Sequence, residues 1–155
     1  MTRRFGQPPE AGRVYRRRPG AYAVLIRGGR VLLTHQQAPE PEFQLPGGGI
    51  DPGEHPLHAL RREVGEETGW SIAGVRRIGA FRRFAYMPEY DLWAEKLCII
   101  YTARPARRLG PPTEAGHSAH WVGFGAAPAL VGNPGDAHFL AGVLARAVRV
   151  LAGQR

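Results

Sequence analysis

The residues best suited to chemistry in this chain are three closely spaced glutamates, Glu63, Glu66 and Glu67. Their i, i+3, i+4 spacing places all three carboxylates on one side of a helix, about one turn apart. Like charges this close repel one another and destabilise an isolated helix. A hard divalent cation removes the repulsion, and Mg²⁺ is held in proteins by carboxylate oxygens together with substrate phosphates. The spacing therefore predicts a magnesium site, with Mn²⁺ as the alternative ion.

The helix that would carry these glutamates has clear predicted ends. Pro56 suits the first helical position, where its missing N–H is harmless, and Gly69 suits the left-handed stop. An apolar stripe at helical spacing gives the helix a face to bury: Leu57, Leu60 and Val64. Just upstream, the glycine run of residues 47–49 forms a loop whose backbone can approach a ligand closely.

The segment from Gly48 to Trp70 resembles the complete Nudix box, the signature of the Nudix hydrolase family. Its fixed or class-restricted positions are filled here by Gly48, Glu54, Arg62, Glu63, Val64, Glu66, Glu67, Gly69 and Trp70. The alternative interpretation is a solvated acidic helix face with i, i+4 pairs such as Arg62 with Glu66. That alternative explains neither the glycine run nor the position of Glu54. The resemblance extends over roughly residues 20–150.

This resemblance implies an α/β fold, a Nudix-type α/β/α sandwich with a mixed β-sheet. It also implies metal-dependent hydrolysis of the pyrophosphate linkage in nucleoside diphosphate derivatives. By position in the box, the expected catalytic residues are Arg62, Glu63, Glu66 and Glu67, and the expected metal ligands are Gly48, Glu63, Glu66 and Glu67. Gly48 would contribute its main-chain carbonyl, and Arg62 would orient a box carboxylate. Glu54 is expected to be mainly structural, as a cap of the helix N-terminus.

The general base is left open by the resemblance. Glu63 is the first choice within the box. In several Nudix subfamilies the base comes from a loop outside the box, where the acidic candidates are Glu114, Glu95, Glu89 and Asp91. Many relatives carry a glutamate about three residues before the tryptophan of the last strand. Ser118 stands three residues before Trp121 here, which argues against a loop base at that place.

The substrate is indicated by two residues after the box. Tyr86 lies sixteen residues beyond Trp70, which resembles a mark of dinucleoside polyphosphate hydrolases, where an aromatic ring stacks on a nucleobase. Arg82 is a candidate phosphate contact near the predicted cleft. The competing substrates are oxidised nucleoside triphosphates, nucleotide sugars or ADP-ribose, and diphosphoinositol phosphates. Against ADP-ribose, residue 85 is Ala rather than the proline of those hydrolases.

A nucleotide-sensing binding module without turnover is the non-enzymatic alternative. Such modules typically lose box carboxylates, and this sequence retains them all. The partner expected for either class is a small-molecule nucleotide, and the sequence leaves homo-oligomerisation open.

Charge and length suggest a basic arm at residues 1–19 and one Nudix hydrolase domain at residues 20–153. Residues 1–20 hold six Arg and one Glu, which is +5 of the formal charge of +8. A basic arm of this kind allows an RNA-end hydrolase, although a solvated arm is the favoured interpretation. The single Cys98 permits no disulfide within the chain, and no apolar run is long enough for a membrane span, so a cytoplasmic location is expected.

Apolar runs and turn residues predict the remaining elements. Strands are expected at residues 21–27, 30–34, 43–45, 71–84, 95–104 and 120–124, and a C-terminal helix at residues 136–152. Gly28-Gly29 predicts a two-residue hairpin, and Gly74 and Gly79 predict bends in the strand after the box. The aromatic-rich residues 85–94 are expected to form a mobile loop.

Overall fold

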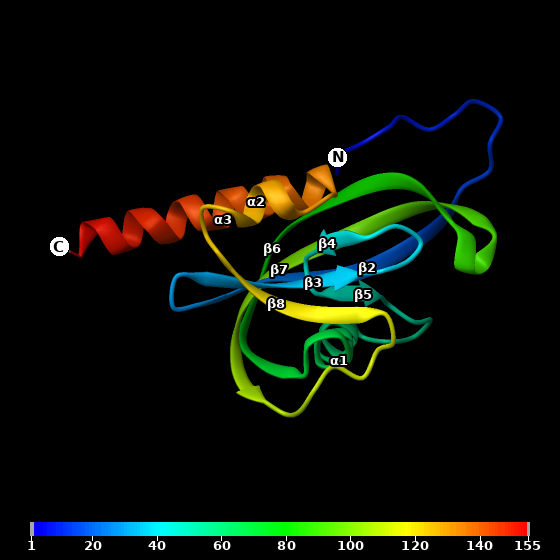
Figure 1. The fold of residues 1–155 in the computed structure, drawn as a ribbon. Helices are drawn as coiled ribbons and strands as arrows, with labels where there is room; N and C mark the ends of the chain where they lie inside the picture. Colours follow the sequence, from blue (N-terminus) through cyan, green and yellow to red (C-terminus); the bar gives the residue numbers. More distant parts are fainter. Residues whose placement is uncertain (1, 155) are drawn as a thin grey trace.

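The computed structural model describes residues 2–154 as three layers, with a β-sheet between α1 on one side and α2 and α3 on the other (Figure 1). The helices are α1 (Pro56–Thr68), α2 (Ala127–Leu130) and α3 (Pro134–Gly153), with a 3₁₀ turn at Pro88–Tyr90. The strands are β1 (Arg3–Arg4), β2 (Arg16–Arg27), β3 (Arg30–Gln36), β4 (Glu42–Gln44), β5 (Gly47–Gly49), β6 (Trp70–Met87), β7 (Leu92–Arg108) and β8 (His117–Gly123). This architecture confirms the predicted α/β/α sandwich.

Strand β2 links the two halves of the sheet. The order is β1-β6-β7-β2-β3-β4, with β5 paired to β2 and β8 paired to β3. The β1–β6 and β2–β7 pairs are parallel and the other pairs are antiparallel, so the sheet is mixed as predicted. Arg27 pairs with Arg30 across the turn at Gly28-Gly29, which confirms the predicted hairpin.

Each face of the sheet buries a separate apolar cluster. On the α3 side, Phe81 and Ile100 pack with Leu140 and are fully buried. On the α1 side, Leu60 and Val64 are fully buried in the second cluster, which confirms the predicted stripe of the box helix. Burying one such side chain contributes about 1.5–3 kcal/mol, so packing on both faces holds α1 firmly against the strands.

The N-terminal residues are more integrated in the fold than the sequence suggested. Strand β2 begins at Arg16, which pairs with Ala94 of β7, so the predicted boundary at residues 19 and 20 falls inside a strand. Further upstream, Phe5 packs on Phe81 with ring centroids 5.5 Å apart. Backbone pairing explains the difference, because a strand within a sheet forms its ladder even where its own side chains are charged and exposed.

The prediction of a mobile loop at residues 85–94 was wrong. Strands β6 and β7 continue as one antiparallel ladder as far as the Met87–Leu92 pair, and a single 3₁₀ turn closes them. Tyr86 pairs directly with Trp93, and aromatic cross-strand pairs of this kind stabilise a hairpin. The predicted bends are confirmed, because the register shifts fall at Gly74 and just before Gly79.

Smaller differences concern element ends. Strand β8 begins at His117, three residues before the prediction, and α2 was not predicted. Helix α3 begins two residues early because the Asn133 side chain caps it, accepting a hydrogen bond from the Gly135 N–H at 2.9 Å. In residues 2–154, no helix is both long enough and apolar enough to cross a bilayer.

A buried carboxyl group joins α3 to the loop before the glycine run. Asp136 is 4% exposed, and its Oδ2 accepts a hydrogen bond from the Leu45 N–H at 3.4 Å. Burial raises the pKa of Asp136 from 3.8 to about 6, although the positive charge of Arg83 lowers it in part. The folded protein therefore favours the protonated carboxyl more than the unfolded chain does.

We predict that this group makes folding stability depend on pH. Its stabilising effect is complete below pH 3.8 and is lost as pH rises through about 6, because ionisation is then unfavourable in the fold. Urea unfolding of the wild-type chain and Asp136→Asn should show the wild type losing about 2–3 kcal/mol relative to the variant between pH 4 and pH 7. A constant difference across that range would contradict the assignment.

Candidate active site

Helix α1 begins and ends where the sequence predicted, but its N-terminal cap is different. His55 is the cap, and its Nδ1 accepts a hydrogen bond from the Leu57 N–H at 3.1 Å. Gly69 closes the helix in the left-handed conformation, at φ 75°. Glu54, expected to cap the helix, instead accepts a hydrogen bond from the Asp51 N–H at 3.0 Å. With both ends fixed, the carboxylates of α1 project from one face towards the glycine run of β5.

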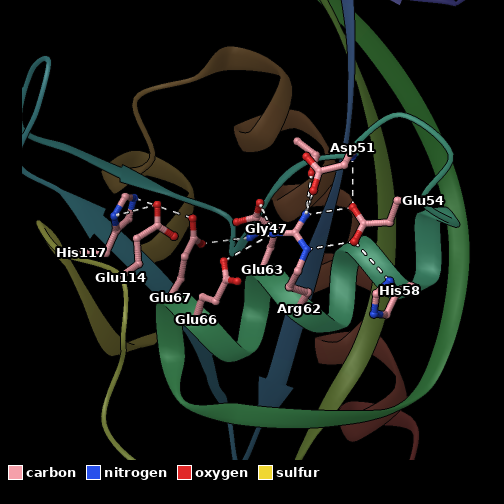
Figure 2. Close-up of polar contacts among 11 residues, drawn as sticks. Gly47, Asp51, Glu54, His58, Arg62, Glu63, Glu66, Glu67, Glu114 and His117 are labelled. Atoms are coloured by element: carbon pink, nitrogen blue, oxygen red, sulfur yellow. Dashed lines mark hydrogen bonds and ion pairs between the residues drawn. The ribbon is translucent and has the colours of Figure 1, made fainter. Parts of the chain in front are cut away.

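Those carboxylates lie close to that of Glu114, which belongs to the loop between β7 and β8. Oxygen atoms of Glu63, Glu66 and Glu114 lie within 4.8 Å of one another. Figure 2 shows Glu67 beside them on α1, and His117 at the far end of the row. The structure thus brings together the three predicted glutamates of the box and one of the loop candidates for the general base.

Glu67 is the most buried carboxylate of the cluster, at 5% exposed. Its Oε2 accepts a hydrogen bond from the Gly47 N–H at 3.1 Å, and its Oε1 lies 3.7 Å from His117 Nε2. Burial raises the pKa of Glu67 well above its usual value, and nearby Glu114 and Glu63 raise it further. Burial likewise raises the pKa of Glu63. In the protein alone, negative charge at both positions is unfavourable.

Arg62 supplies the positive charge at the other end of the row (Figure 2). Its guanidinium donates two hydrogen bonds of 2.9 Å to Glu54, and Nη1 donates to Glu63 at 3.0 Å. The paired bonds to Arg62 lower the pKa of Glu54 to about 2. The same Nη1 also donates a hydrogen bond of 3.4 Å to Glu66 Oε2. A bidentate pair of this kind fixes a side chain in direction as well as in position, so the pair with Glu54 holds the Arg62 guanidinium where it also donates to Glu63.

Gly48 lies directly against Glu63. A methyl group at this position would be 2.5 Å from the Glu63 Cδ, which is far inside van der Waals contact. The neighbouring Gly49 has no atom within 4 Å of the corresponding point. An alanine at position 48 would therefore have to displace the Glu63 carboxyl group from this position.

Glu114 is fixed in place through the backbone of α1. The N–H groups of Thr113 and Glu114 donate to the Glu66 carbonyl at 2.8 and 3.0 Å. This carbonyl is in the last turn of the helix, where carbonyl groups lack a helical partner. Within residues 2–154, Glu114 Oε2 is among the buried side-chain atoms that have no hydrogen-bond partner.

These features fit a divalent cation. The cluster offers several carboxylate oxygens within coordination range of one centre, one of them buried without a partner, and oxygen is the ligand type that Mg²⁺ and Mn²⁺ prefer. The residues that would hold the ion are Glu63 and Glu66, with Glu67 or Glu114 completing the set. His55 and His58, which are exposed, lie away from this centre, and His58 Nδ1 instead contacts Glu54 at 3.2 Å.

The cluster opens into a cavity of about 630 Å³. Its lining includes the acidic residues Glu63, Glu67 and Glu114, the cationic residues Arg17, Arg18 and Lys96, and the aromatic residues Tyr22 and Tyr90. Arg18 places its guanidinium 4.6 Å from the centre of the Tyr90 ring. Acidic groups and cationic and aromatic groups therefore line one cavity.

The predicted substrate contacts Tyr86 and Arg82 do not line this cavity. Tyr86 is 43% exposed, and its hydroxyl donates a hydrogen bond to Asp91, which raises the pKa of Tyr86. Arg82 lies 3.7 Å from Glu95, which also accepts a hydrogen bond from Arg17 at 3.4 Å. Glu95 and Asp91 are thus paired away from the carboxylate cluster, whereas Glu89 lies at the cavity rim.

Several cavity residues were missed from the sequence, among them Tyr22 and Lys96. Tyr22 and Lys96 are on neighbouring strands, and burial raises the pKa of Tyr22 and lowers that of Lys96. A signal for Lys96 was present, because it is the only lysine in the chain and interrupts an apolar strand. Tyr22 gives no such signal, since a tyrosine in an apolar strand is usually part of the core.

Comparison with known proteins agrees with this geometry. The NUDIX domain family matches residues 16–143, and the chain belongs to that family. A MutT protein from Bacillus halodurans shares the fold, with a TM-score of 0.67 over 82% of each chain at 20% identity.

Curated relatives match only part of the chain. A putative 8-oxo-dGTP diphosphatase from Bacillus subtilis is 34% identical over 74 residues, which is 48% of this chain and 50% of that protein. An RNA pyrophosphohydrolase from Caulobacter vibrioides is 47% identical over 76 residues, 46% of this chain and 44% of that protein. The chain thus spans half or less of the length of these relatives.

We predict that Gly48→Ala displaces Glu63 and lowers kcat by roughly 100-fold, because a misplacement of about 1 Å in a catalytic site has an effect of that size. Gly49→Ala is the matched control, since its methyl group enters open space. Steady-state hydrolysis of ATP in Mg²⁺, with circular dichroism to verify folding, measures both variants. Equal activity in the two would show that the position of Glu63 is unimportant.

Proposed function

We propose that this protein hydrolyses a phosphoanhydride bond of a nucleoside polyphosphate in a divalent-metal-dependent reaction. The observation that carries the proposal is the convergence of Glu63, Glu66 and Glu114 within 4.8 Å, beside a cavity whose lining also includes cationic and aromatic side chains. Carboxylates hold a metal ion, whereas arginine, lysine and aromatic side chains bind phosphate groups and a nucleobase. Membership in the NUDIX family supports the same reaction class.

In this proposal the glutamates of α1 hold the metal ion and Arg62 positions one of them. Glu63, Glu66 and Glu67 would be the ion's ligands, with the Gly48 carbonyl as the expected main-chain contribution. When bound, the ion would neutralise phosphate oxygens and acidify an attacking water. Arg62 holds the Glu63 carboxyl in one orientation through a 3.0 Å hydrogen bond.

Two residues can serve as the general base. Glu63 remains the first choice, as a base in place of a metal ligand, because it lies in the cluster and is held by Arg62. Glu114 is the alternative, since it lies in the same cluster and has an unpartnered, buried Oε2. Glu95 and Asp91 support the proposal less well because each is engaged by another side chain.

The nucleoside end of the substrate fits the part of the cavity that is lined by Tyr90 and Arg18. Tyr90 and Arg18 form a stacked pair at its rim, and a flat surface of this kind suits a nucleobase. Lys96 pairs with Arg18 in the β2–β7 ladder and lines the same cavity, where its ammonium group suits a phosphate. A nucleotide placed in this way directs its phosphate chain towards the carboxylates.

Several substrates remain within this class. Dinucleoside polyphosphates are the first candidate from the sequence, and the relatives' names suggest 8-oxo-dGTP and the 5′ end of RNA. The RNA candidate draws support from Arg17 and Arg18, which line the cavity and belong to the basic N-terminal region. Nucleotide sugars, ADP-ribose and diphosphoinositol phosphates complete the alternatives. A nucleotide-sensing module without turnover is the non-enzymatic candidate.

A substrate panel tests the proposal and separates these candidates. With Mg²⁺, the wild type should release phosphate or nucleotide products from at least one nucleoside polyphosphate, and Glu66→Gln or Glu67→Gln should lower kcat by more than about 100-fold. Loss of groups that only support a metal ligand costs about 10–100-fold, so loss of a ligand should cost more. Glu40→Gln, an exposed carboxylate outside the cavity, is the control. Saturable nucleotide binding without turnover across the panel would favour the sensor.

We further predict that Tyr90→Ala raises KM for the preferred nucleotide roughly tenfold, the effect expected when one base loses its stacking partner. Tyr86→Ala should change KM less than twofold, because the Tyr86 ring packs on Trp93 outside the cavity lining. Both side chains are exposed at the β6–β7 hairpin, so Tyr86→Ala is the control for loss of an exposed tyrosine ring there. A larger effect at Tyr86 would restore the base-stacking role predicted for it from the sequence.

A further inference from the structure

Tyr22 lines the catalytic cavity from strand β2 but has no part in the carboxylate cluster. Arg18, Gly20 and Tyr22 share one face of this strand, because residues two apart in a strand point the same way. Directly opposite Tyr22 in the β2–β5 pair is Gly47, whose N–H donates to Glu67. The half-buried tyrosine is therefore adjacent to the glycine run beside the cluster.

The ring of Tyr22 extends over Gly20 and brings its hydroxyl beside the Gly48 carbonyl. A methyl group at position 20 would lie 2.8 Å from Tyr22 Cε2, 2.9 Å from the hydroxyl oxygen and 3.0 Å from the Gly48 carbonyl oxygen. These three atoms thus surround one point above β2. The lack of a side chain at Gly20 leaves the space that the tyrosine ring occupies.

The Tyr22 hydroxyl is available to a ligand in the cavity. The hydroxyl of Tyr86 donates to Asp91, whereas within residues 2–154 the Tyr22 hydroxyl has no hydrogen-bond partner. A tyrosine hydroxyl is neutral near pH 7 and offers one O–H donor. A donor of this kind can bind an anionic oxygen without adding a charge to the site.

Two cationic side chains lie along the same part of the sheet. Arg18 shares the strand face of Tyr22, and Lys96 is the direct partner of Arg18 in the β2–β7 ladder. Both line the cavity together with Tyr22. A guanidinium, an ammonium and a hydroxyl therefore border the cavity near the Gly48 carbonyl, where the metal ion is expected. Phosphate oxygens are the ligand that suits all three donors.

We propose that the Tyr22 hydroxyl donates a hydrogen bond to a phosphate oxygen of the bound substrate, next to the metal-binding end of the cavity. The inference rests on the proposed function, because it assumes that the phosphate chain lies between the cationic side chains and the carboxylate cluster. A donor that the fold already holds in place needs no reorganisation as charge develops on the phosphate oxygens. It therefore stabilises the transition state as well as the bound substrate.

A second cavity, of about 520 Å³, adjoins the cluster through His117, which lines both cavities and lies 3.7 Å from Glu67. Its lining includes Trp70 and Trp121, whose rings meet edge to face with centroids 5.8 Å apart. Tyr22 lines only the first cavity, so the proposed contact concerns the catalytic cavity alone.

Tyr22→Phe tests the contact directly, because it removes the hydroxyl and keeps the ring. It should lower kcat/KM for the preferred nucleoside polyphosphate roughly 10–100-fold, mostly through kcat, as expected when a donor to a charged oxygen is lost. Tyr101→Phe is the matched control, since Tyr101 is 6% exposed, belongs to the neighbouring strand β7 and lines neither cavity. Circular dichroism verifies the folding of both variants. An unchanged kcat/KM in Tyr22→Phe, or an equal loss in Tyr101→Phe, would overturn the proposal.

Calorimetric binding of methylenediphosphonate, a non-hydrolysable pyrophosphate analogue without a nucleoside, gives a readout that does not depend on turnover. In the presence of Mg²⁺, Tyr22→Phe should raise its Kd roughly tenfold, and Tyr101→Phe should leave it unchanged. Mn²⁺ binding without the diphosphonate should be the same in Tyr22→Phe and the wild type. A tenfold loss of Mn²⁺ affinity would instead assign the hydroxyl to the metal site and overturn the phosphate contact.

The two experiments separate the two hypotheses. Weaker diphosphonate binding by Tyr22→Phe, with no hydrolysis of any nucleotide by the wild type, would remove the proposed function but keep the phosphate contact. Hydrolysis at the same rate by the wild type and Tyr22→Phe, with equal diphosphonate binding, would keep the function and remove the contact.

Discussion

Repulsion among four carboxylates is the constraint on which this structure depends. Two like charges about 4 Å apart repel by about 4 kcal/mol at an effective dielectric constant of 20. Glu63, Glu66 and Glu114 lie at about that separation, and Glu67 is buried beside them. Arg62 compensates part of this charge at one end of the row. Such an arrangement is unfavourable in the protein alone, and a divalent cation bound there would make it favourable.

The rest of the fold holds these groups together against that repulsion. Leu60 and Val64 anchor α1 in the core, so the helix cannot rotate its carboxylates away. Strand β5 provides the Gly47 N–H for Glu67 and the space at Gly48 for Glu63. The loop before β8 is tied to the last turn of α1 through the Glu66 carbonyl. Three separate segments thus meet at one centre, each fixed by backbone contacts or by burial.

The two cavities next to the cluster depend on a different part of the chain. Strand β2 and the β6–β7 hairpin form the Arg18 and Tyr90 surface, and β8 with the lower end of β6 and β7 forms the tryptophan-lined one. These elements surround the same α1 scaffold (Figure 1). The carboxylate cluster and the tyrosine and tryptophan surfaces are therefore carried largely by separate elements.

The sequence by itself determined α1, its ends, its buried stripe and the glutamates at i, i+3 and i+4, because these follow from local helical geometry and capping. It also predicted the Gly28-Gly29 hairpin and the three-layer architecture, the latter through the Nudix box. Only the tertiary structure decided that Glu114, rather than Glu95, joins the cluster, and that Tyr90 lines the cavity while Tyr86 packs against Trp93. Those outcomes depend on strand register and on contacts between residues far apart in the chain, which local spacing does not encode.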